Sequence, residues 1–184
     1  GMTEVFVNTR EELQELIERF KNNADREGYV RFKNFVQSLM KYAKGTAVVD
    51  FDVSEADGKK STLKNFLSDS KYNVVDFWAS WCGPCRREIG HLKKVRDAYT
   101  DKGLVILGTV VWDEMEDHLK AMKELEITWP QIFNKTEATE LYGIAGIPQI
   151  ILFDPAGKIV ARDLRGEEIN KLLDKALQDN GGKL

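Results

Sequence analysis

The sequence predicts an α/β domain over residues 46–184, preceded by a helical extension over residues 1–45. Three observations support this division. A strand pattern, a helix pattern and a second apolar strand pattern follow one another over residues 73–111, as in a βαβ unit with a right-handed crossover. A β-hairpin pattern and a closing amphipathic helix follow over residues 149–177. The first 45 residues carry helical periodicity alone. We therefore expect a central mixed sheet flanked by helices.

The N-terminal extension is expected to form a helical hairpin. Thr9-Arg10-Glu11-Glu12 fits a capping box ahead of apolar residues at helical spacing. A second helical pattern runs from Phe32 to Ala43 and ends near Gly45, and a polar link over Asp25 to Gly28 separates the two. We expect the hairpin to pack on the main domain. The alternative is that it belongs to a larger N-terminal domain or to a dimer contact.

Within the domain, β-branched and aromatic runs indicate strands, and apolar spacings of three and four residues indicate helices. The strands are expected over 47–51, 73–79, 104–111, 149–153 and 158–163. The helices are expected over 62–67, from the cysteine motif to about Lys102, over 114–126, over 137–142 and over 169–177. The inward-facing residues of the helix over 114–126 are expected to be Met115, Leu119, Met122 and Leu125.

Composition and charge exclude several classes of function. The chain is 42% apolar and 31% charged, which is typical of a globular protein. Its net charge of −3 provides no basic field, so no nucleic-acid partner is expected. No apolar run reaches the roughly 18 residues of a membrane-spanning helix. No signal peptide is visible, but Gly1 ahead of Met2 is typical of a cloning remnant, so this end of the chain does not decide the compartment.

The two cysteines, Cys82 and Cys85, lie in the segment Trp81-Cys82-Gly83-Pro84-Cys85, where a strand pattern ends and a helix pattern begins. Pro84 suits the first turn of a helix, so Cys82 is expected at the helix N-terminus. Free N–H groups and the helix dipole favour a thiolate at that position. Cys85 follows one turn later on the same face. We therefore expect Cys82 to attack a substrate disulfide, and Cys85 to release the product by closing a Cys82–Cys85 disulfide.

A metal site is the main alternative for a cysteine pair of this spacing. Zinc would need two further ligands, and the chain offers only His91 and His118 as histidines. His91 lies on the same predicted helix as Cys85, in a poor ligand geometry. Asp113, Asp117 and His118 are expected on a solvated helix surface rather than in a metal cluster. We predict neither a metal nor a cofactor.

The segment Val75-Asp76-Phe77-Trp78-Ala79-Ser80-Trp81-Cys82-Gly83-Pro84-Cys85 resembles the active-site segment of thioredoxins. Further segments resemble the TlpA/ResA branch of these thioredoxin-like, AhpC/TSA-related proteins: Asp101 to Gly108, Ile127 to Gln131, Leu141 to Pro148, and Phe153 to Lys158. The resemblance spans about Val48 to Leu177 and leaves the first 45 residues outside it. It implies the thioredoxin fold and a thiol:disulfide oxidoreductase activity.

The resemblance also implies a substrate groove. Ile147 and Pro148 match the family's cis-proline, which would lie beside Cys82 and pair its preceding backbone with an extended substrate. The alternative is an ordinary trans proline before a strand. Trp81, Gly83 and Pro84 would complete the groove. Trp78, by contrast, is expected in the core.

Two acids are candidates for moving protons. Asp76 matches the buried acid of thioredoxins, and an ionised carboxylate in so apolar a strand would be costly, so its pKa should rise. It could then take the proton of Cys85 through water as a general base. The alternative is an acid on a solvent-facing strand side. Glu88 matches a functional glutamate of the ResA type, the alternative being a surface residue of the charged turn Arg86-Arg87-Glu88.

The resemblance also implies a reductase of protein or peptide disulfides in an extracytoplasmic compartment, periplasmic or membrane-tethered, that receives electrons from a membrane partner. The alternatives are the oxidase or isomerase direction of the same chemistry and a non-catalytic binding module. A peroxidase is not favoured, since its cysteine setting and its nearby Thr and Arg have no match. Two residues depart from the family pattern: Gly90 stands where many relatives have proline, and Gln149 where threonine is usual. The oligomeric state is not predicted.

Overall fold

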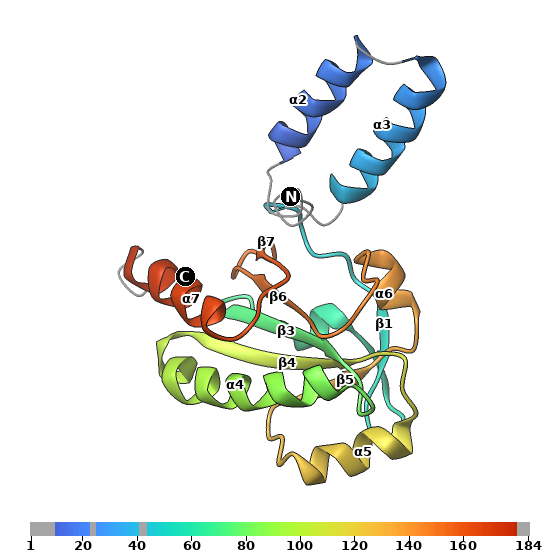
Figure 1. The fold of residues 1–184 in the computed structure, drawn as a ribbon. Coiled ribbons are helices and arrows are strands. Elements are labelled where there is room, and N and C mark those ends of the chain that lie inside the picture. The colour runs from blue at the N-terminus through green and yellow to red at the C-terminus, as the bar shows by residue number, and fades with distance from the viewer. Residues whose placement is uncertain (1–9, 23–24, 41–43, 180–184) are drawn as a thin grey trace.

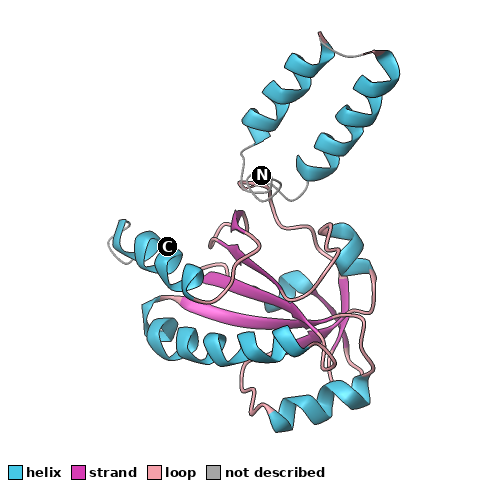
Figure 2. Ribbon diagram, viewed as in Figure 1, coloured by secondary structure: helices cyan, strands magenta, loops and turns pink. Residues whose placement is uncertain are grey.

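The computed structural model describes residues 10–22, 25–40 and 44–179 and contains a seven-stranded sheet in the order β2-β1-β5-β4-β3-β6-β7 (Figures 1 and 2). The strands are β1 (Asp52–Ser54), β2 (Lys60–Thr62), β3 (Tyr72–Trp78), β4 (Leu104–Val110), β5 (Gln131–Phe133), β6 (Gln149–Phe153) and β7 (Ile159–Ala161). Strands β3, β4 and β5 run parallel, and the outer strands join them by antiparallel pairing. The expected central mixed sheet flanked by helices is confirmed.

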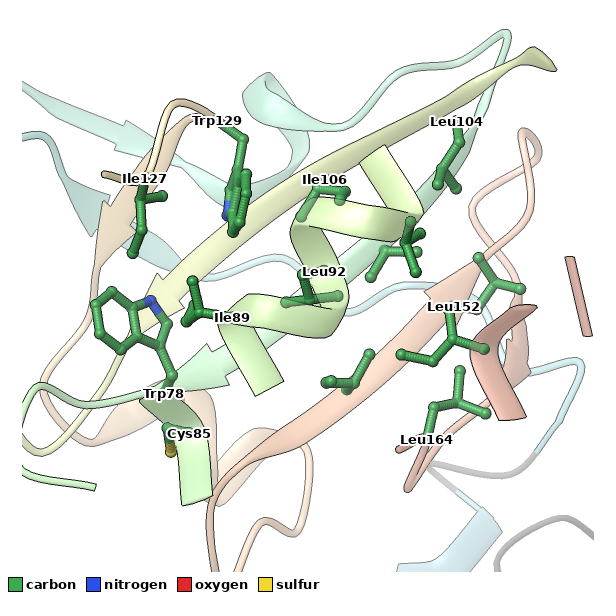
Figure 3. Close-up of a cluster of buried hydrophobic side chains, with 14 of the residues drawn as sticks. Trp78, Cys85, Ile89, Leu92, Leu104, Ile106, Ile127, Trp129, Leu152 and Leu164 are labelled. Carbon is green, nitrogen blue, oxygen red and sulfur yellow. The ribbon is translucent and has the colours of Figure 1, made fainter. Parts of the chain in front are cut away.

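Helices pack on both faces of this sheet (Figure 1). They are the short 3₁₀ turns η1 (Leu63–Phe66) and η2 (Thr100–Lys102) and the α-helices α4 (Gly83–Tyr99), α5 (Met115–Glu124), α6 (Glu137–Leu141) and α7 (Glu167–Asp179). One buried cluster contains residues of α4, α5 and α7 and extends from Cys85 to the far end of the sheet (Figure 3). A second cluster contains residues of η1 and α6 on the opposite face. Each cluster shields one face of the central strands from water.

Strand β3 lies near the middle of the sheet and all seven of its residues are buried. Its β-branched and aromatic residues suit a strand that is covered on both faces. Asp76 is the one charged residue in this strand, and its partners across the sheet are Gly108 on β4 and Ile150 on β6. An acid therefore occupies a position where the surroundings are otherwise apolar.

Gly108 makes room for a buried side chain from the next strand. A Cβ on Gly108 would lie 2.1 Å from Oε1 of Gln131, so no larger residue fits unless Gln131 moves. Trp78 Nε1 donates a hydrogen bond of 2.9 Å to the same Gln131 oxygen. Gln131 thus lies across the glycine and connects β5 with β3 beneath the helices.

The N-terminal extension is a helical hairpin of α2 (Arg10–Lys21) and α3 (Arg26–Met40). Its buried cluster consists of Leu13, Ile17 and Val36, which all belong to the hairpin itself. Figure 1 shows the two helices side by side and directed away from the sheet. The expected packing on the main domain is therefore not found among the described residues. The predicted capping residue Thr9 and the end of the pattern at Ala43 lie outside the described residues, as does the predicted stop after α7.

Two further expectations about the domain are wrong. Residues 47–51 form no strand, because their backbone groups bond to scattered partners: Ala47 bridges Lys158, and Val49 N donates to the hydroxyl of Tyr142. The first strand, β1, begins at Asp52 instead.

The inward face of helix α5 is only partly as predicted: Met122 and Leu125 pack against the buried cluster as expected, but Leu119 does not. Leu119 is 39% exposed, while His118 and Ala121 are buried beneath the helix. The His118 ring packs edge-on against Trp78 with 5.5 Å between ring centroids. Asp113 is buried as well, so the predicted solvated surface of Asp113 and His118 is wrong, and only Asp117 is exposed as expected.

No helix in the described part of the chain is long and apolar enough to cross a membrane.

Candidate active site

The two cysteines lie where β3 passes into α4. Cys82 is the N-cap of the helix, with Pro84 in the first turn, and the backbone N–H of Cys85 donates to Cys82 Sγ over 3.2 Å. The two residues form a disulfide with 5.2 Å between their Cα atoms. Cys82 is 4% exposed and Cys85 is fully buried, so only the first of the two residues has any accessible surface. In the reduced protein, the same N–H would stabilise a thiolate on Cys82.

The loop before Cys82 is held by an acid that sequence reasoning placed on the surface. Asp113 accepts hydrogen bonds from the N–H and the hydroxyl of Ser80 at 2.7 and 2.9 Å, and from the N–H of Glu114 at 2.9 Å. Ser80 and Asp113 follow the neighbouring parallel strands β3 and β4, whose C-terminal ends lie together in the sheet. Because both residues directly follow neighbouring parallel strands, the sequence pattern could have indicated that Ser80 and Asp113 lie close together.

Trp81 presents a largely exposed ring beside the cysteines. It is 63% exposed, and its Nε1 donates to the carbonyl of Trp112 at 2.8 Å. Gly83 and Pro84 are exposed next to it. These residues therefore form an accessible surface around the sulfur of Cys82, as a substrate groove requires, whereas Trp78 is fully buried as expected.

A second chain segment approaches the disulfide from the sheet. The peptide bond between Ile147 and Pro148 is cis, and the carbonyl oxygen of Ile147 lies 3.7 Å from Cys82 Sγ. Gln149, which follows, is buried and exchanges two hydrogen bonds with Asp163, each of 2.7 Å. The glutamine at this position therefore joins the start of β6 to the loop before α7.

Asp76 lies beneath the helix that carries the cysteines. Its strand neighbours Val74 and Trp78 belong to the buried cluster that contains Cys85, and alternate residues of a strand share one face. The Asp76 side chain is fully buried and neither carboxyl oxygen has a hydrogen-bond partner. Burial, and to a lesser extent the nearby Glu88 carboxylate, raise the pKa of Asp76 to about 8, against a smaller lowering by Arg165. The predicted rise is confirmed.

Glu88 is half-buried on α4, one turn beyond Cys85. Its Oε2 accepts a hydrogen bond of 3.1 Å from the backbone N–H of Gly166, which lies at the start of α7. Its charge also acts on Asp76. Glu88 thus has a defined partner and faces the buried acid instead of pointing freely into solvent.

The structure brings the sequence-predicted residues into one region around the C-terminal end of strand β3. Arg165 belongs to the same region, because its guanidinium donates to the carbonyl of Pro148, but no motif identified it. His91 and His118 do not join the cysteines: among the described residues, no group of three or more His, Cys, Asp or Glu side chains could hold a metal ion. The site can exchange disulfides with its own two sulfurs.

Comparisons with known proteins agree with this chemistry. The AhpC/TSA family model matches residues 44–162. ResA, a thiol-disulfide oxidoreductase of Bacillus cereus, is 26% identical over 153 residues, which cover 82% of this chain and 86% of that protein.

Solved structures show the same relationship. The thioredoxin domain of a thiol-disulfide oxidoreductase from Bacteroides vulgatus is 36% identical with a TM-score of 0.66, and the match covers 73% of this chain and 97% of that domain. A thiol:disulfide interchange protein from a Bacteroides species is also 36% identical, with a TM-score of 0.65 over 74% of this chain and 91% of that one. Because the family model covers most of the domain and the cysteine pair is in place, this chain belongs to the AhpC/TSA family and is a TlpA/ResA-like thiol-disulfide oxidoreductase with the thioredoxin fold.

Proposed function

We propose that the enzyme reduces disulfides of protein or peptide substrates, with Cys82 as the nucleophile and Cys85 as the resolving thiol. The observation that supports this most directly is the position of Cys82 at the N-terminus of α4, next to the exposed Trp81, Gly83 and Pro84, while Cys85 is fully buried. The Cys82 thiolate attacks one sulfur of the substrate disulfide, forms a mixed disulfide and releases the other sulfur as a thiolate. The Cys85 thiolate then attacks Cys82 Sγ and releases the second substrate sulfur. The substrate gains two electrons, and the Cys82–Cys85 disulfide forms.

Asp76 is proposed as the group that accepts the proton of Cys85. Cys85 is fully buried and needs a proton acceptor near it before it can attack. A carboxyl with a pKa of about 8 is well matched to a thiol, whose ordinary pKa is about 8.5. Glu88 is proposed to support this transfer through its charge beside Asp76. Trp81, Gly83, Pro84, Ile147 and Pro148 are proposed to line the substrate groove.

A reductase of disulfides is useful only in a compartment where disulfides form and persist. We infer an extracytoplasmic location, periplasmic or membrane-tethered, because structural disulfides that a reductase would act on form in oxidising compartments. A reductase there needs a supply of electrons, so we propose a membrane partner as the donor. The family match beginning at residue 44 and the hairpin's own buried cluster support a division into a helical extension over 1–45 and a thioredoxin-like domain over 46–184.

The direction is tested by the reduction potential of the Cys82–Cys85 pair, equilibrated against dithiothreitol and glutathione buffers and followed by tryptophan fluorescence. A value near or below about −250 mV supports a reductase. A value above about −180 mV would contradict that direction and indicate an oxidase or isomerase.

The residue roles are tested with insulin as the disulfide substrate. We expect Cys82→Ser to abolish insulin reduction and Cys85→Ser, its matched control, to accumulate a mixed disulfide visible on a non-reducing gel. Full activity in Cys82→Ser would refute the assignment. Turnover of hydrogen peroxide at a rate above that of insulin would indicate a peroxidase instead. The absence of any reversible cycling of the pair would indicate a binding module.

A further inference from the structure

The loop between β7 and α7, residues 162–166, is attached to the groove at two separate elements. Asp163 exchanges two hydrogen bonds of 2.7 Å with Gln149 on β6, one through its backbone N–H and one through its carboxylate. Gly166 N donates to Glu88 on α4 over 3.1 Å. Asp163 and Gly166 have φ values of 57° and 50°, a left-handed conformation that glycine adopts readily and Asp tolerates better than most residues. The loop is therefore shaped by the elements that carry the site.

Arg165 extends from this loop to the chain segment beside the catalytic sulfur. Its side chain is half-buried, and its guanidinium donates to the carbonyl of Pro148 and, at 2.8 Å, to the carbonyl of Leu164. The neighbouring carbonyl, that of Ile147, is the one in contact with Cys82 Sγ. A guanidinium carries several donors in a fixed plane, so it can hold the Pro148 carbonyl while its charge acts on other groups.

The loop that carries Arg165 also lies beside the strand position that pairs with the buried acid. The backbone N–H of Leu164 donates to the carbonyl of Ile150 over 3.2 Å, and Ile150 is the cross-strand partner of Asp76. Two charged groups act on Asp76, the negative Glu88 from α4 and the positive Arg165 from this loop, while its strand partners Gly108 and Ile150 carry no charge. Burial and Glu88 favour the neutral carboxyl of Asp76, and Arg165 favours its ionised form. Arg165 therefore opposes the two effects that keep the acid protonated.

Two more charged or titratable groups lie near the loop. Arg162 lies 3.7 Å from the carboxylate of Asp163. His91, further along α4, faces Gly166: a Cβ at Gly166 would lie 3.7 Å from its Cε1. His91 is exposed and makes no contact with the reacting sulfurs that the structure describes, which makes it a suitable site for a control substitution.

We propose that Arg165 is a positioning residue for the exchange reaction, holding the Pro148 carbonyl in the groove and placing one positive charge near the carboxyl groups of Asp76 and Glu88. The inference rests on the proposed function, since it assigns Arg165 to the groove and to the proton acceptor of that reaction. It has two separable parts. The hydrogen bond to Pro148 affects substrate binding, and the charge affects the pH at which Asp76 can accept a proton.

The test compares the unsubstituted enzyme with Arg165→Lys, which keeps the charge, and with Arg165→Gln and Arg165→Met, which remove it. His91→Gln is the matched control. Each reduced protein is mixed with insulin in a stopped-flow instrument between pH 5 and 10, and its oxidation is followed by tryptophan fluorescence. The same proteins are assayed at steady state for kcat and KM. Circular dichroism identifies which variants are folded, and either neutral variant suffices for the comparison.

In the neutral variants we expect the midpoint of the pH–rate profile to rise by at most about 1 pH unit, the lower end of what an opposite charge contributes, because Arg165 is the smallest of the effects on the pKa of Asp76. Arg165→Lys and His91→Gln should keep the original midpoint. The KM for insulin should rise about 2- to 10-fold in Arg165→Lys, as expected for one lost hydrogen bond, and stay unchanged in His91→Gln.

Identical midpoints in all the folded proteins would overturn the role of the charge. An equal rise in the lysine and neutral variants would also overturn it, because a disturbed loop would then be the cause. An unchanged KM in Arg165→Lys would overturn the role of the bond to Pro148. If the unsubstituted enzyme does not reduce insulin, the proposed function itself fails, which is a result distinct from each of these.

Discussion

Replacing Asp76 with asparagine should stabilise the folded protein at neutral pH, which is unusual for a buried residue in the centre of a sheet. The carboxyl is fully buried without a hydrogen-bond partner, and its pKa rises from 3.8 to about 8 on folding. Between these pH values, the folded protein holds a proton that the unfolded chain has lost. The contribution of Asp76 to the free energy of unfolding must therefore fall as the pH rises from about 4 to about 8.

The magnitude follows from the size of this change. Each pH unit of difference corresponds to about 1.4 kcal/mol, and pH 7 lies about three units above the ordinary pKa of aspartate. Asp76 therefore destabilises the fold at pH 7 by an amount on the order of 4 kcal/mol. Asparagine has nearly the same shape and no titration, so Asp76→Asn should recover most of this free energy at pH 7 and little of it at pH 4.

The assay is urea unfolding of the oxidised protein between pH 4 and 9, followed by tryptophan fluorescence. The exposed loop residue Asp69 provides the matched control, because Asp69→Asn removes a carboxylate without changing the core. We expect unfolding free energies that diverge between the enzyme and Asp76→Asn as the pH rises, and that stay parallel for Asp69→Asn. Parallel curves for Asp76→Asn would show that the buried acid does not hold its proton, and the reasoning would be refuted.

Three other substitutions test the packing around the site. Gly108→Ala should lower the free energy of unfolding by about 1–3 kcal/mol, because its Cβ would overlap the side chain of Gln131. The double variant with Gln131→Ala should show a smaller loss than the sum of the two single losses in urea unfolding, and strict additivity would exclude the overlap. Asp113→Ala should cost about 1–3 kcal/mol in the same measurement, since it leaves the N–H of Ser80 without its partner, and an unchanged midpoint would mean that the contact contributes nothing. Burial lowers the pKa of His118, against a smaller raising by Asp113, so the unfolded chain binds a proton first and stability should fall as the pH drops below about 6.5. His118→Gln should remove this part of the pH dependence, and equal slopes for both proteins between pH 5 and 7 would contradict it.

Much of the active site could be predicted because its signals are local. The cysteine spacing, the proline in the first turn and the apolar strand before them lie within a few residues of one another, and each has a direct physical meaning. The strong apolar pattern around Asp76 predicted its burial and its raised pKa for the same reason. The helix after the motif buries Ile89, Leu92, Val95 and Tyr99, which recur at the three- and four-residue spacing of a helix face.

The predictions that were wrong concern residues whose burial depends on contacts with segments distant in the sequence. Helix α5 places His118 rather than Leu119 inward, because the His118 ring packs against Trp78. In the sequence, Asp113 has the pattern of a solvated helix start. In the structure, it is buried because it accepts hydrogen bonds from Ser80. Residues 47–51 are apolar enough for a strand, but their bonding partners come from the hairpin around Gly157 and from Tyr142. No local pattern contains these partners.

The sequence by itself determined the chemistry of this protein: two cysteines at a helix N-terminus, an acid in an apolar strand, and the order of strands and helices that brings them together. These are properties of residue type and spacing, which act over one or two turns of chain. Only the tertiary structure decided how the acid is surrounded, because Glu88 and Arg165 reach Asp76 from α4 and from the loop before α7. Charge interactions depend on distance in space, and the fold alone brings residues 76 and 165 close enough to act on each other.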